Sequence, residues 1–175
     1  MRGGRAKAPR ADAAWREEPR PGDVEAVRAL VARVGVFSAA EVEIAAELVE
    51  ERLRSGLASG YHFVFADQRD GLAGYTCFGP IPATRSSFDL YWIAVHPELQ
   101  GSGLGARLLA ESERRIAAQG GDRVYVDTSS RREYTPAHAL YTRGGYREAA
   151  RLLDFYSPGD AKLIFEKVLA AVPER

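Results

Sequence analysis

The chain has 175 residues, of which 46% are hydrophobic and 27% are charged, and its 24 Lys and Arg residues balance its 24 Asp and Glu residues. These values are typical of one globular domain, and no apolar run approaches the roughly 18 residues that a membrane-spanning helix needs. Cys77 is the sole cysteine, which excludes an intramolecular disulfide. The basic N-terminus has no secretory signal pattern, so a cytoplasmic location is expected.

Residues 1–12 are predicted to form a disordered basic tail. They are rich in Arg, Ala and Gly and show no hydrophobic periodicity. A nucleic-acid-binding protein would carry basic residues interleaved with aromatic ones on a folded face, and the rest of the chain has no such pattern. We therefore expect no nucleic-acid partner, a single domain over residues 13–170, and a C-terminal tail at residues 171–175.

The first part of the domain is predicted to be mainly helical. Residues 13–18 could form a short strand, and Pro21 and Asp23 start a helix whose apolar residues recur at helical spacing until Gly35. Ser38 and Glu41 form a capping box for a second helix, which ends near residue 56.

An antiparallel meander is expected next. From Tyr61 the hydrophobic period becomes two, and Asp70 and Gly71 supply a hairpin turn into a strand at residues 72–78. A further strand covers residues 87–95, an apolar and aromatic run that stops before Pro97.

A glycine-rich loop follows this strand and leads into an amphipathic helix over residues 104–119. Gly101, Gly103 and Gly105 let the backbone fold closely, and the N–H groups at the helix start would converge into an anion cradle suited to a pyrophosphate. A tight turn that only packs a strand on a helix is the alternative. A P-loop is excluded, because it needs Lys-Ser or Lys-Thr where this chain has Ala106 and Arg107. A Rossmann fingerprint fits poorly, because it belongs in the first βα turn of a parallel sheet and this loop follows helices and a meander.

The remaining elements are a strand at residues 123–128, a short helix at 135–143, and strands at about 146–155 and 162–169 with a loop at 157–160. The predicted fold class is α/β (α+β). It has three layers, with a mixed and mostly antiparallel sheet of about seven strands between helices on both faces. It is not a doubly wound fold.

Two blocks of sequence resemble the GNAT superfamily of acyl-CoA-dependent N-acetyltransferases. The superfamily pattern Gln/Arg-x-x-Gly-x-Gly/Ala is met by Gln100, Gly103 and Gly105, and residues 137–146 look like its later helix with a tyrosine and a Gly-aromatic ending. The resemblance extends from about residue 14 to residue 169 and implies the three-layer GNAT fold. Residues 124–128 and 154–160 also resemble ribosomal-protein alanine N-acetyltransferases.

The resemblance implies that acetyl-CoA is the co-substrate. Its pyrophosphate would meet the cradle and its pantetheine arm would pair with an exposed strand edge, so the implied binding residues are Ile93, Ala94, Val95, Gln100, Gly101, Ser102, Gly103, Leu104, Gly105 and Ala106. Tyr141 falls on the superfamily's acid tyrosine, whose hydroxyl faces the departing sulfur. The alternative role for Tyr141 is packing of a helix on the sheet.

The sequence points to the residues of the acceptor site less specifically than to those of the coenzyme site. A primary amine is mostly protonated at neutral pH, so a base or a water chain must take its proton. Asp127 is the first candidate for this base and Asp89 the second. The alternative role for either residue is to cap a strand end. Phe37, Tyr91, Trp92 and Phe155 could line the acceptor pocket, and core packing explains at least half of them equally well. Tyr134 stands where many superfamily members have Asn.

The sequence therefore predicts an N-acetyltransferase that acts on a small-molecule amine by direct attack. Protein N-terminal acetylation and a non-catalytic acyl-CoA sensor are the alternatives. No metal site is expected, because His62, His96 and His138 are far apart in the sequence and none has a second ligand at metal-binding spacing. The oligomeric state is left open, with a homodimer as one option.

Overall fold

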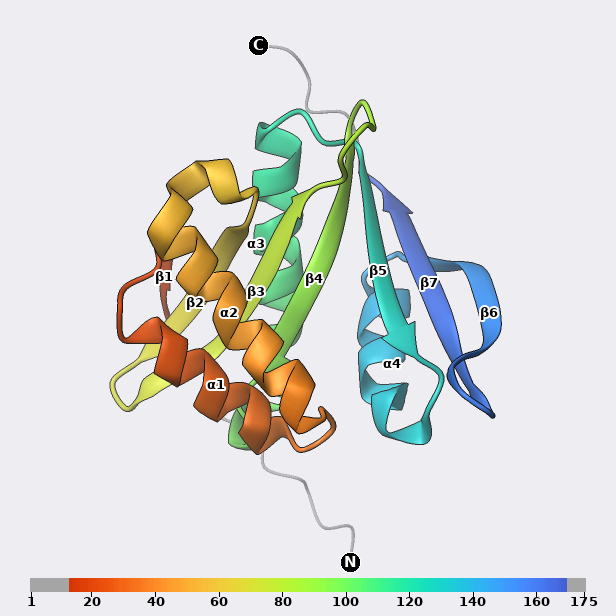
Figure 1. Cartoon of the computed structure of the whole chain (residues 1–175), viewed down its shortest axis with the longest axis horizontal. Coiled ribbons are helices and arrows are strands. Elements are labelled where there is room, and N and C mark those ends of the chain that lie inside the picture. The colour runs from red at the N-terminus through yellow and green to blue at the C-terminus, as the bar shows by residue number, and fades with distance from the viewer. Residues whose placement is uncertain (1–12, 170–175) are drawn as a thin grey trace, which may run out of the picture.

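The computed structural model describes residues 13–169, and the tails expected at residues 1–12 and 171–175 lie outside this range. One sheet has the strand order β1-β2-β3-β4-β5-β7-β6. Helices cover both of its faces (Figure 1). Every described strand pair is antiparallel except β4 with β5. The predicted fold class is confirmed.

The strands are β1 (Ala14–Arg16), β2 (His62–Gln68), β3 (Gly71–Pro80), β4 (Ser87–Val95), β5 (Arg123–Ser129), β6 (Arg147–Ser157) and β7 (Asp160–Val168). The helices are α1 (Asp23–Val34), α2 (Ala39–Ser55), α3 (Leu104–Ala118) and α4 (Thr135–Arg143). Three short 3₁₀ helices, which the sequence did not predict, lie at Gly56–Ser59, Pro97–Leu99 and Arg132–Tyr134.

The ends of the first two helices follow the predicted capping chemistry. Gly35 ends α1 in the left-handed region at φ 79°, which glycine adopts without strain. Ser38 accepts a hydrogen bond from the Glu41 N–H, and the Glu41 side chain accepts one from the Ser38 N–H, so both halves of the capping box are present. The link between α1 and α2 is therefore short and fixed at both ends.

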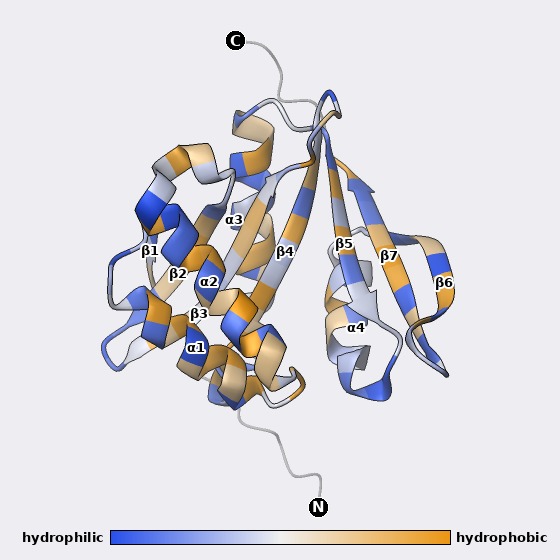
Figure 2. Cartoon of the chain, viewed as in Figure 1, coloured by the Kyte–Doolittle hydropathy of each residue, from blue (hydrophilic) through white to orange (hydrophobic). Residues whose placement is uncertain are grey.

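Two hydrophobic clusters lie on opposite faces of the sheet. One joins α1 and α2 to β2, β3 and β4, and the other joins α3 and α4 to a larger part of the sheet. Phe63 and Phe65 belong to the first cluster and Val64 to the second, as the period-two pattern of β2 predicts. Hydrophobic and hydrophilic residues alternate in the first part of β4, whereas the end of β4 is hydrophobic throughout (Figure 2).

Small differences from the predicted elements concern the β2–β3 hairpin and α2. The tight turn consists of Arg69 and Asp70, so Gly71 opens β3 rather than closing the turn. Ile44 and Leu53 have helical spacing with the core residues of α2, yet they are 47% and 38% exposed. The apolar surface of α2 is therefore wider than its core contacts require.

Candidate active site

The sheet opens between its two parallel strands. β4 pairs with β5 only where residues 87–89 meet residues 123–125. Beyond this point the two strands diverge, and among residues 13–169 no strand lies beside the remainder of β4 on the β5 side (Figure 1). This leaves a row of backbone groups along β4 exposed to a ligand.

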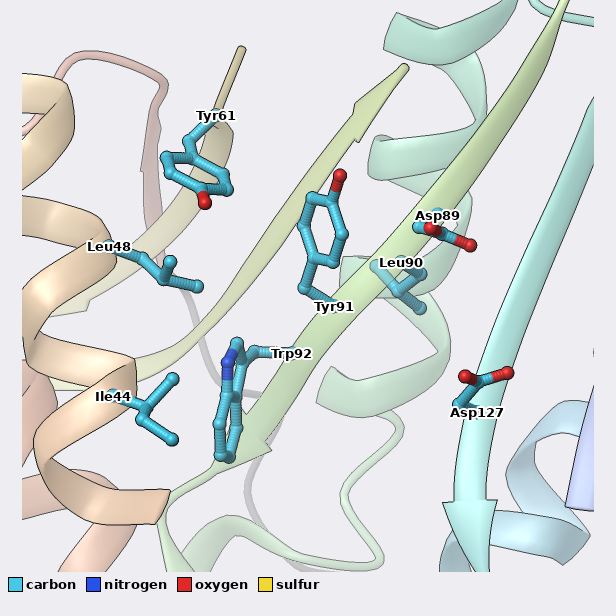
Figure 3. A pocket seen from close by; sticks show the side chains of 8 residues that line it. All are labelled: Ile44, Leu48, Tyr61, Asp89, Leu90, Tyr91, Trp92 and Asp127. Carbon is cyan, nitrogen blue, oxygen red and sulfur yellow. The ribbon is translucent and has the colours of Figure 1, made fainter. Parts of the chain in front are cut away.

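A β-bulge in β4 lies next to the opening. Cys77 pairs with Trp92 while the next residue, Phe78, pairs with Leu90, so Tyr91 is the extra residue. The bulge breaks the alternation of side chains. Leu90 packs in the cluster on the α3 face of the sheet, whereas Tyr91 and Trp92 both lie on the α2 face (Figure 3). A strict period of two would have placed Tyr91 and Trp92 on opposite faces.

A pocket of about 290 Å³ lies between α2 and the opening (Figure 3). Its apolar wall comes from α2 and β4, its aromatic residues come from β4 and the start of β2, and two carboxylates from β4 and β5 lie at one end. The lining residues are Ile44, Leu48, Tyr61, Asp89, Leu90, Tyr91, Trp92 and Asp127.

The two carboxylates have different surroundings. Asp127 forms an ion pair with Lys162, whose ammonium also lies 4.9 Å from the centre of the Phe155 ring. Asp89 is half-buried, and burial followed by repulsion from Asp127 raises its pKa, while Lys162 acts in the opposite direction. Asp89 therefore takes up a proton more readily than an exposed aspartate does.

The glycine loop has the geometry of an anion cradle. Gly101 and Gly103 have φ of 78° and 90°, and no described protein atom lies within 4 Å of the position a Cβ would take at either residue. Gly103 precedes the first residue of α3, so the N–H groups of the first helical turn have no intrahelical acceptor. The loop thus offers open space beside aligned donors, which suits a phosphate group.

The exposed edge of β4 continues toward this cradle. The His96 N–H donates to Ala73 O on β3, and successive residues of a strand direct their backbone groups to opposite sides. Ile93 and Val95 therefore direct theirs to the open side, and Ala94 directs its groups to β3. The Gln100 side chain donates to Val95 O at 3.4 Å, which links the end of the strand to the loop.

Helix α4 lies against the start of α3. A Cβ at Gly105 would lie 3.4 Å from the Leu140 side chain and 3.7 Å from that of Val95. Tyr141, next to Leu140, is 4% exposed and packs with Tyr146 and Phe165 at ring distances of 5.9 and 5.6 Å. Burial raises the pKa of Tyr141, so its hydroxyl stays protonated and is able to donate a hydrogen bond.

Comparison with known proteins decides the family. The model of the family described as "Acetyltransferase (GNAT) domain" matches residues 59–148. A solved structure of a GNAT-family protein from Desulfovibrio desulfuricans is 45% identical, with a TM-score of 0.88, and covers 90% of this chain and 99% of its own. The chain belongs to the GNAT acetyltransferase family. No curated protein matches it in sequence.

More distant structures share the GNAT fold. The ribosomal-protein-S18-alanine N-acetyltransferase from Escherichia coli has a TM-score of 0.69 at 18% identity and covers 93% of this chain and 98% of its own. A Salmonella typhimurium protein, solved with its cofactor acetyl-CoA, has a TM-score of 0.71 at 16% identity and covers 94% of this chain and 98% of its own. At these identities the likeness supports the fold alone.

The structure gives Tyr134 a role of its own where many GNAT members carry Asn. Its hydroxyl donates to Val36 O at 3.4 Å, and its ring packs edge-on against Phe37 at 6.1 Å. Phe37 in turn packs on Trp92 at 5.0 Å. In this GNAT domain Tyr134 thus holds the α1–α2 link next to Trp92, which lines the pocket.

One pocket is lined by four of the predicted site residues, Tyr91, Trp92, Asp89 and Asp127. Phe37 and Phe155 do not line it; Phe37 packs on Trp92, and Phe155 lies beside Lys162. The sequence pattern did not point to Ile44, Leu48 and Tyr61 as pocket residues or to Lys162 as the partner of Asp127. The exposure of Ile44 is a signal that appears only in the folded structure. Within residues 13–169, no group of three His, Cys, Asp or Glu side chains is arranged to hold a metal, and no helix is long and apolar enough to span a membrane.

Proposed function

We propose that this GNAT protein transfers an acetyl group from acetyl-CoA to the primary amine of a small molecule by direct attack. The observation that carries the proposal is the meeting of two features at the β4–β5 opening. An apolar pocket that ends in two carboxylates reaches the opening from one side. The unpaired edge of β4 and the glycine cradle approach it from the other.

Acetyl-CoA fits the second feature. The cradle formed by residues 100–106 would hold the pyrophosphate on the N–H groups at the start of α3. Ile93 and Val95 would pair with the amides of the pantetheine arm along the open edge of β4, and one of their N–H groups would polarise the thioester carbonyl. When bound, the coenzyme supplies an acetyl group activated as a thioester.

Asp89 is the better placed base for the acceptor amine. A primary ammonium group has a pKa near 10.4, so a proton must leave before attack. Asp127 forms an ion pair with Lys162, which occupies its carboxylate and restrains its side chain. Asp89 has a raised pKa and no ion pair among the described residues. We therefore place Asp89 first and Asp127 second, which reverses the order suggested by the sequence resemblance.

Tyr141 is proposed to act on the leaving group. As the amine nitrogen bonds to the carbonyl carbon, the bond from that carbon to sulfur breaks and the sulfur takes the electron pair. A phenol whose pKa lies above that of a thiol transfers its proton uphill. The hydroxyl of Tyr141 would therefore stabilise the thiolate by a hydrogen bond, and the amine proton would pass to Asp89.

A direct test is acetyl-CoA-dependent thiol release with a panel of primary amines, an aminoglycoside such as kanamycin, and peptides with a free N-terminus. We expect turnover with at least one small amine and acetylation of its nitrogen by mass spectrometry. Turnover with peptides alone would instead indicate protein N-terminal acetylation. Binding of acetyl-CoA by calorimetry without thiol release across the panel would indicate a sensor domain and overturn the proposal.

The homodimer and the cytoplasmic location are two further predictions. The edge strand β6 exposes Leu153 and Phe155, at 74% and 53%, and a second copy of the chain could cover them. Sedimentation equilibrium would test the homodimer, and cell fractionation would test the cytoplasmic location.

A further inference from the structure

Helix α2 carries a second apolar stripe, Ile44 and Leu48, of which Leu48 packs partly against the core and Ile44 does not. Its core side is formed by Val42, Ala45, Ala46 and Val49, all of them buried. Ile44 and Leu48 are four residues apart and lie on one face of the helix, and both point toward the pocket (Figure 3). Since Ile44 is 47% exposed, it gains little from the fold, and an apolar ligand would cover it.

The opposite side of the pocket is aromatic and uncharged. Trp92 lies across from Ile44 in Figure 3 and is held in place by Phe37. Tyr61 and Tyr91 pack edge to face at 5.7 Å. Burial raises the pKa of Tyr91 to about 12, so its hydroxyl remains neutral at any ordinary working pH. These rings can contact an apolar body and add cation–π attraction for an ammonium group.

The charges around the pocket leave one carboxylate for the ligand. Asp127 is paired with Lys162. Two acidic groups on neighbouring elements are also engaged, because Glu41 accepts hydrogen bonds in the α2 capping box and Asp160 accepts from Ser129 and pairs with Arg131. Among the described residues that line the pocket, Asp89 is thus the acidic side chain that forms no ion pair, although Lys162 lies near enough to lower its pKa.

We infer that the acceptor is a compact monoamine with an apolar aliphatic or aromatic body, an assignment that rests on the proposed acetyltransferase function. The amine would lie beside Asp89, and the body would lie between Trp92 and the Ile44–Leu48 stripe. A volume of about 290 Å³ is at the low end for small-molecule sites, which start near roughly 300 Å³. A polyamine would place additional cations against an apolar wall, which is unfavourable.

The test compares kcat/KM for phenethylamine, methylamine and spermidine by thiol release from acetyl-CoA. We expect phenethylamine to exceed both others by at least about 30-fold, because each buried carbon adds favourable transfer free energy. In Ile44→Ser the preference for phenethylamine over methylamine should fall about tenfold, mainly through KM. Leu53→Ser is the matched control, since Leu53 is an exposed leucine of α2 that does not line the pocket. It should keep the parent's preference.

The results distinguish a wrong acceptor class from a wrong enzymatic function. Equal or better turnover of spermidine, or an unchanged preference in Ile44→Ser, would overturn the inference and leave the acetyltransferase function standing. No thiol release with any amine, despite acetyl-CoA binding, would overturn both. Thermal unfolding of the two serine variants should match the parent within a few degrees, because both side chains are exposed.

Discussion

Replacing Gly103 by Ala tests whether the cradle depends on its backbone conformation. Gly103 has φ 90° and ψ 0° at the start of α3, a conformation that costs an L-residue about 1–2 kcal/mol. No described atom lies within 4 Å of the new Cβ, so the folded chain meets no steric clash. We expect the free energy of unfolding to fall by about 1–2 kcal/mol, which lowers Tm by roughly 2–8 °C in a chain of this size.

The same substitution should weaken coenzyme binding. If the loop relaxes out of the left-handed region to relieve the strain, restoring the cradle costs a similar free energy, so the Kd for coenzyme A should rise about 5- to 30-fold. A methyl group in the open space beside the loop would add to this effect. Calorimetry with coenzyme A measures the change.

Gly120→Ala is the matched control. Gly120 has φ 83° and also has no described atom within 4 Å of its Cβ position, so its local strain is nearly equal. It lies just beyond the other end of α3, a helix of 15 residues that is roughly 22 Å long. Gly120→Ala should lose similar stability and bind coenzyme A like the parent. If Gly103→Ala also retains the parent's affinity, the cradle assignment is refuted.

Three further predictions concern the chemistry. Tyr141→Phe removes the hydroxyl and keeps the ring packing, so turnover should fall at least roughly tenfold while acetyl-CoA affinity stays within about threefold; parent-like turnover would make Tyr141 a packing residue. Asp89→Asn should lower kcat and abolish the acidic limb of the pH–rate profile, whereas Asp127→Asn should keep that limb; the opposite pattern would restore Asp127 as the base. Lys162 lowers the pKa of Asp89, and a general base must be ionised, so Lys162→Gln should move the acidic limb to higher pH. An acidic limb that does not move would show that the ionisation of Asp89 does not control the rate.

Local chemistry made much of the fold predictable. The capping box at Ser38 and Glu41, the left-handed Gly35, and the period-two alternation around Phe63 each report on neighbours within a few residues, so the sequence suffices to place α1, α2 and β2. The glycine loop was likewise predictable, because positive φ values at Gly101 and Gly103 require glycine.

The lining of the pocket was only partly predictable. Tyr91 and Trp92 were expected at the site, but their shared orientation depends on a bulge that is defined by pairing with β3. The preference for Asp89 over Asp127 depends on Lys162, which lies 35 positions beyond Asp127 in the numbering and reaches it because β7 pairs with β5. The exposure of Ile44 depends on how far α2 covers the sheet.

The sequence by itself determined the order and type of the elements and the glycine loop before α3, because hydrophobic period, capping and glycine conformation act over short stretches of chain. The tertiary structure alone decided where β4 and β5 diverge, which carboxylate is left unpaired and which apolar side chains face the pocket. Those features arise from contacts between residues distant in the sequence, and strand register and burial set them.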